Sequence, residues 1–130
     1  TGRIASVVAV GGWHACAILD NGQITCWGWN LSGQLGNGSN DNTNAPGVTI
    51  NLGNGRTATA ITAGFENTCA LLDNGNVTCC GDNSDGQLGN ANSTNTPGNT
   101  INFGNGRTAT AITARRTVPK TAKMSWKKSA

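Results

Sequence analysis

The chain contains five cysteines, and four of them form two pairs with the same spacing. Cys16 and Cys26 stand on either side of an Asp-Asn-Gly segment, and Cys69 and Cys79 stand in the same relation to a second one. Asp-Asn-Gly between β-prone runs is typical of a β-hairpin turn, which places the members of each pair opposite each other. Cross-strand Cβ atoms of such pairs lie near disulfide range. We therefore expect two hairpin disulfides, with two reduced and buried cysteine pairs as the alternative.

Other side chains with catalytic or metal-binding potential do not form a recognisable site. The spacing of the cysteine pairs differs from the close C-x₂₋₄-C pairs of zinc sites. His14 is the only histidine, and no nucleophile and orienting carboxylate can be placed beside it. Asp82 opens a segment that resembles a calcium loop but lacks its distal bidentate glutamate. We expect no catalytic residue, no metal ion and no cofactor, and we assign no role to the fifth cysteine, Cys80.

The cysteine pairs belong to a longer internal repeat. The segment CAILDNGQITCWGWNLSGQLGN matches CALLDNGNVTCCGDNSDGQLGN further along the chain, and NLGNGRTATAITA matches NFGNGRTATAITA. A period near fifty residues indicates an array of supersecondary units. We place the first repeat at 1–53, the second at 54–104 and the start of a third at 105–114, followed by a basic, non-repeating segment at 115–130 that we expect to be disordered.

Each repeat contains four short β-prone runs separated by turn residues. In the second repeat the first three runs are 58–62, 68–72 and 76–79. The fourth run is 48–52 in the first repeat and 100–103 in the second. Four short strands per period are typical of one β-propeller blade. We predict an all-β fold of about two four-stranded antiparallel blades plus a partial third, and we expect it to be a fragment of a larger propeller.

The segment after each hairpin carries a family resemblance. WGWNLSGQLG, which begins at Trp27, resembles the W-G-x-N-x-x-G-Q-L-G signature of the regulator of chromosome condensation repeat, and GGWHACA before it resembles the family's G-G-x-H-x-x-A element. The resemblance covers residues 3–114 and implies a propeller, usually of seven blades. We expect structural roles, in turns and between blades, for the motif residues Trp27, Gly28, Gly33, Gln34, Leu35, Gly36, Gly81, Gly86, Gln87, Leu88 and Gly89.

Differences between the two copies indicate where a partner would bind. Trp13 takes the place that Glu66 has in the second copy, and Trp29 takes the place of Asp82. These positions fall in connections, where a repeat scaffold carries its specificity. We predict Trp13, Trp29, Asn30 and Asp82 as binding residues, while partial burial of both tryptophans between blades is the alternative.

Charge is distributed unevenly along the chain. Residues 1–114 contain three arginines and six acidic residues, whereas residues 115–130 contain six basic residues and no acid. The repeat body therefore has no surface suited to nucleic acid. No apolar run approaches the length of a membrane span.

These observations predict a non-catalytic module that presents a protein–protein interaction surface to a partner we do not identify. The expected disulfides favour an extracellular or cell-surface location. The resemblance also implies an alternative, part of a guanine-nucleotide exchange factor for a small GTPase. A fragment without activity of its own is a further alternative, and open blade edges would permit self-association.

Overall fold

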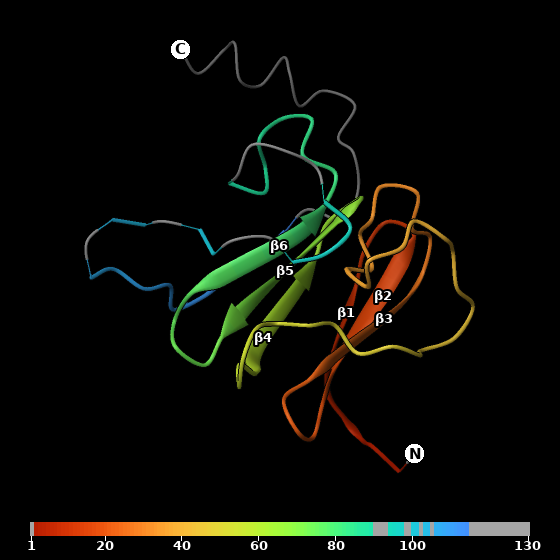
Figure 1. The fold of residues 1–130 in the computed structure, drawn as a ribbon, viewed down its shortest axis with the longest axis horizontal. Coiled ribbons are helices and arrows are strands. Elements are labelled where there is room, and N and C mark those ends of the chain that lie inside the picture. Colours follow the sequence, from red (N-terminus) through yellow and green to blue (C-terminus); the bar gives the residue numbers. More distant parts are fainter. Residues whose placement is uncertain (1, 90–93, 98–99, 102, 105, 115–130) are drawn as a thin grey trace.

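The fold consists of two antiparallel sheets, one from each predicted repeat. The computed structural model describes residues 2–89, 94–97, 100–101, 103–104 and 106–114. The first sheet contains β1 (Ala5–Val10), β2 (His14–Leu19) and β3 (Ile24–Gly28), and the second contains β4 (Ala58–Ala63), β5 (Asn67–Leu72) and β6 (Val77–Gly81). Figure 1 shows the two sheets side by side, with the β2–β3 and β5–β6 turns at one end and the longer loops at the other. The predicted disorder of 115–130 lies outside the described residues.

Both central hairpins have the register that the cysteine spacing predicts. Cys16 is paired with Cys26 across β2 and β3, and Cys69 is paired with Cys79 across β5 and β6. The Cα atoms of each pair lie 4.1 Å apart and a disulfide joins them. Identical registers follow from identical turns, since a two-strand register is fixed by the turn that connects the strands.

The fourth strand of each blade is the one element that the structure corrects. Each sheet has three continuous strands, and the fourth segment of the first repeat pairs only at isolated positions, Thr43 with Gly28 and Thr49 with Thr25. Pro46 and Gly47 lie between these two bridges. Proline has no N–H to donate to a ladder and glycine weakens extended structure, which accounts for the gap between the two bridges. Within the expected run 48–52 only Thr49 forms a bridge. In the second repeat the described bridge joins Thr94 to Gly81.

One apolar core lies between the two sheets. The first sheet contributes the Cys16–Cys26 pair with Ile18 and Ile24, and the second contributes Ile61 and its neighbours. Leu35, which follows β3, is fully buried in the same cluster. A second cluster forms on the far side of the second sheet around Leu71, Val77, Cys79 and Leu88, and Ala109 and Ile112 of the third repeat pack against it.

The outer side of the first sheet is less covered than the matching side of the second. Val8 is 57% exposed, whereas Ile61, the residue at the same repeat position, is 9% exposed because the first sheet packs against it. Uncovered apolar strand surface favours association. Self-association through open blade edges stays a prediction. No helix in the described part of the chain has the length and apolar character needed to cross a membrane.

Candidate interaction surface

The loops at one end of the sheets gather the residues that differ most between the copies. We call this end the loop face, and it is formed by residues 11–13, 29–42, 64–66 and 82–89. These segments connect β1 to β2 and β4 to β5 and follow β3 and β6, so they meet at the same end of both sheets (Figure 1). The opposite end, with the hairpin turns, is called the turn face.

Two tryptophans and a leucine are exposed on the loop face. Trp13 is 62% exposed, Trp29 is 39% exposed and Leu31 is 60% exposed. The backbone N–H of Trp29 donates to the carbonyl of Trp13 at 2.9 Å, and the Trp13 ring meets the edge of Phe65 with 6.3 Å between centroids. Neither tryptophan is fully buried in this structure, and the choice between a binding role and partial burial between blades stays open. These three exposed residues and Phe65, all on the loop face, are here called the aromatic patch.

Asn30 was expected to bind a partner, and the structure corrects that expectation. Its side chain is fully buried. The Nδ2 atom donates to the carbonyls of Ser39 and Asp41 at 2.8 and 3.0 Å, and Oδ1 accepts from the N–H of Leu35 at 2.9 Å. Asn30 thus holds the long loop after β3 in shape, because each of its polar atoms satisfies loop backbone that would otherwise be unpaired.

Asp82 remains accessible at the edge of the loop face. Its Oδ2 atom accepts hydrogen bonds from Ser84 Oγ and Gln87 Nε2, both at 2.9 Å. It also lines a hollow of about 460 Å³ between the loops of the two repeats. The hollow is lined by Leu31, Ser32, Asn40, Asp82, Thr94 and Asn95.

The first repeat has Trp29 at the position where the second repeat has Asp82. This difference has a consequence inside the first repeat that the sequence analysis did not predict. In the second repeat the carboxylate of Asp82 accepts from Gln87 Nε2. In the first repeat Trp29 supplies no such acceptor, and Gln34 Nε2 is buried without a partner among the described residues. A buried, unpaired amide donor costs free energy. The unpaired donor could be predicted from the sequence only by comparing the hydrogen-bond acceptors available to Gln34 with those available to Gln87.

The shared motif residues have structural positions. Gly36 has φ +67°, and a Cβ there would lie 2.8 Å from Cys80 Sγ of the facing sheet. Gly28 has φ +115°, and its Cβ would lie 2.7 Å from the carbonyl of Trp13. Glycine is required at both positions by the backbone angle and by the close contact. Leu35 and Leu88 are fully buried.

His14 and Cys80 are both buried at the junction of the two sheets. His14 Nε2 lies 2.7 Å from Thr68 Oγ1, and burial lowers the pKa of the imidazole to about 4. Burial raises the pKa of the Cys80 thiol to about 12. A neutral imidazole and a protonated thiol, both shielded from solvent, suit packing and hydrogen bonding better than proton transfer. No group of three metal-ligating side chains occurs among the described residues.

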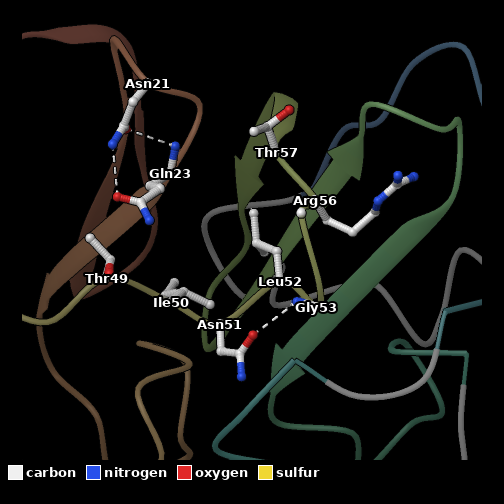
Figure 2. Close-up of a pocket in the computed structure, with 10 residues that line it drawn as sticks. Asn21, Gln23, Thr49, Ile50, Asn51, Leu52, Gly53, Arg56 and Thr57 are labelled. Atoms are coloured by element: carbon white, nitrogen blue, oxygen red, sulfur yellow. Dashed lines mark hydrogen bonds between the residues drawn. The ribbon is translucent and has the colours of Figure 1, made fainter.

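A second hollow of about 460 Å³ lies on the turn face, between the first hairpin turn and residues 49–57 (Figure 2). Its polar groups are largely paired with one another: Asn21 Nδ2 donates to Gln23 Oε1 at 2.8 Å, and Asn51 Oδ1 accepts from the N–H of Gly53 at 2.9 Å. Arg56 extends away from Asn21 and Gln23 and forms an ion pair with Asp73 at 3.6 Å (Figure 2). In contrast to the loop face, the cation of this hollow is paired with a carboxylate.

Comparison with known proteins agrees with this architecture. A family model described as the regulator of chromosome condensation (RCC1) repeat matches residues 4–34 and 58–87, and a second model with the same description matches residues 21–71. The chain belongs to the RCC1 repeat family. The expected resemblance is thereby confirmed, and the two sheets are blades of an RCC1-type β-propeller.

Relatives within the RCC1 repeat family are much longer than this chain. The ultraviolet-B receptor UVR8 of Arabidopsis thaliana is 34% identical over 80 residues, which cover 61% of this chain and 18% of the receptor. The RCC2 homologue of Danio rerio is 38% identical over 81 residues, covering 62% of this chain and 16% of that protein. The structure of yeast RCC1 (Prp20) bound to Kap60 matches with a TM-score of 0.65 and 24% identity, over 87% of this chain and 28% of that chain. The chain thus spans less than a fifth of these two curated relatives.

Proposed function

We propose that this chain is a non-catalytic RCC1-type propeller segment that binds a partner protein through its loop face. The exposed aromatic patch is the observation that carries this proposal: Trp13, Trp29 and Leu31 are each more than a third exposed, on loops held by a buried scaffold. Exposed aromatic residues in a rigid setting are the side chains that dominate protein interfaces. Yeast RCC1, which shares the fold, has been crystallised bound to another protein, Kap60.

The rigidity of the loops supports the same proposal. The loop after β3 is fixed by the Asn30 side chain, and the N–H of Gly12 donates to the carbonyl of Gly64 across the two repeats at 3.1 Å. Ser32 Oγ also donates to the Glu66 carboxylate, which links the loops of the two blades. A preorganised surface loses little conformational entropy on binding.

Affinity capture with matched variants tests the proposal. The full chain, its W13S/W29S variant and its V48S variant are immobilised and exposed to extract or medium from the native source. Val48 is 69% exposed but lies on the outer segment that pairs with β3, away from the aromatic patch. We expect a specific protein to be retained by the unmodified chain and by V48S and lost from W13S/W29S. Equal retention by all three would contradict the proposal.

We further propose that the protein is secreted or displayed at a cell surface. The two hairpin disulfides support this location, because disulfides persist in oxidising compartments and are rare in the cytosol. Titration of thiols in protein isolated without reductant from its native source is the test. Cys80 alone should react after denaturation. Reaction of all five cysteines would contradict an oxidising location. Guanine-nucleotide exchange stays a prediction of the family resemblance.

A further inference from the structure

The charged side chains of the described residues divide between the two ends of the sheets. All three described arginines lie at the turn face. Arg3 pairs with Asp20 at 3.2 Å and Arg56 pairs with Asp73 at 3.6 Å. Arg107 precedes Ala109, whose N–H donates to Gly75 in the second hairpin turn. At the turn face, two of the three arginines are therefore paired with carboxylates.

The loop face carries four carboxylates and, within the described ranges, no arginine or lysine. Glu66 and Asp82 are adjacent, since the N–H of Asp82 donates to the Glu66 carbonyl at 2.8 Å. Asp85 follows in the same loop, and Asp41 lies in the loop that Asn30 holds. None of the four forms an ion pair in the part of the chain that the structure describes. Like-signed charges around one surface attract a partner of the opposite sign and repel others.

The hollow beside Asp82 has the lining that a long cationic side chain requires. Leu31 provides an apolar wall, Asp82 provides a carboxylate, and Asn40 and Asn95 provide amide groups that bond to each other at 2.9 Å. Arginine and lysine place an apolar stem along such a wall and keep the charged head near an acidic group. The aromatic patch lies on the same face, and a guanidinium or ammonium group binds favourably over a tryptophan ring.

We propose that the loop face binds an arginine- or lysine-rich segment of a partner protein, with one cationic side chain in the hollow beside Asp82 and another against Trp13 or Trp29. This inference rests on the proposed function and adds the chemistry of the partner. At the loop face unpaired carboxylates occur together with the exposed Trp13 and Trp29, so the occupant should satisfy both. The chain's own segment 115–130, which has six basic residues, is the competing occupant.

Fluorescence anisotropy with a labelled peptide of alternating arginine and glycine tests this inference on the full chain. Asp82→Asn and Asp20→Asn change the net charge equally, but Asp20 lies at the turn face beside Arg3. We expect D82N and W13L each to weaken binding by roughly three- to ten-fold, and D20N by less than about two-fold. Binding should also weaken as ionic strength rises from about 0.05 to 0.3 M, because salt screens exposed charges.

Two results would overturn the inference. Equal weakening by D82N and D20N would show that the peptide responds to net charge alone, and no binding of the arginine peptide above that of a glutamate–glycine peptide would remove the basis for a cationic partner. A third result would identify the chain's own segment 115–130, and not a partner, as the occupant of the loop face. In that case, replacing its six basic residues by glutamine strengthens peptide binding when Asp82 is present but not in the D82N variant. Loss of the natural partner from W13S/W29S but not from D82N would leave the proposed function intact while rejecting this inference.

Discussion

His14 Nε2 of the first sheet lies 2.7 Å from Thr68 Oγ1 of the second, and the Thr68 hydroxyl donates in turn to the Gln34 carbonyl at 2.6 Å. This chain of hydrogen bonds crosses the boundary between the two blades in a buried setting. The loops of the aromatic patch begin directly beside it, since Trp13 precedes His14. The junction therefore connects the stability of the blade interface to the geometry of the proposed binding surface.

Replacing Thr68 by valine should weaken the junction without changing its volume much. The variant loses the hydroxyl, so His14 Nε2 loses its partner and the Gln34 carbonyl keeps only the weak donor Cys80 Sγ. We expect a loss of about 1–3 kcal/mol in the free energy of unfolding. Urea denaturation measures the change, and Thr68→Ser, which keeps the hydroxyl, is the control. Equal stability of T68V and T68S would show that these hydrogen bonds contribute nothing.

Stability should depend on pH through His14. Its pKa is about 4 in the folded chain, below its ordinary value of 6.5, because burial disfavours the charged imidazole. The neutral form is favoured by folding, so this contribution is complete above about pH 6.5 and is lost as pH falls toward about 4. It amounts to at most about 3 kcal/mol.

The matched variant is His14→Asn, which carries the residue that the second copy has at Asn67. Denaturation curves at about pH 7 and about pH 4.5 should differ more for the unmodified chain than for H14N, since asparagine does not titrate in this range. An identical pH dependence in both proteins would assign the effect to other groups.

Removal of one hairpin disulfide should destabilise the fold by a predictable amount. Cys16 and Cys26 are ten residues apart, so the C16A/C26A variant should lose about 2–3 kcal/mol in the chain-entropy description of a closed loop. The Cys69–Cys79 disulfide closes a loop of the same length, so the C69A/C79A variant should lose a similar amount. Thermal and urea denaturation under non-reducing conditions provide the values, and unchanged stability in either variant would show that the bond does not form in solution.

Trp29→Asp should relieve the unpaired donor of Gln34. Aspartate at this position reproduces the Asp82–Gln87 pair of the second repeat, in which the carboxylate accepts at 2.9 Å. We expect W29D to be more stable than W29A by about 1 kcal/mol or more. The gain should vanish when Gln34 is also replaced by leucine, and a double-mutant cycle measures that coupling. A gain that persists in the Q34L background would point to another cause.

The hairpins and disulfides could be predicted because their determinants are local. An Asp-Asn-Gly turn fixes the register of each hairpin, and the register places Cys16 opposite Cys26. The β-prone residues of 48–52 did not predict its pairing correctly, because only Thr49 of that run forms a bridge to the first sheet.

The site was harder to predict because it depends on tertiary contacts. Asn30 lies between two exposed residues of the loop, yet its side chain turns inward to carbonyls at positions 39 and 41. The exposure of Trp13 and Trp29 depends on how the two sheets pack, which no local pattern specifies. Their difference from the second copy is the signal in the sequence that indicates the loop face.

The most direct test of the loop face as a partner-binding surface is site-specific photo-crosslinking in the native source. The photoreactive residue benzoylphenylalanine replaces Trp13 in one variant and Val48 in a second, and the cross-linked products are identified by mass spectrometry. The account predicts a cross-link between position 13 and one reproducible protein, absent when the probe is at position 48. Cross-links of the same protein from both positions, or from position 48 alone, would contradict it.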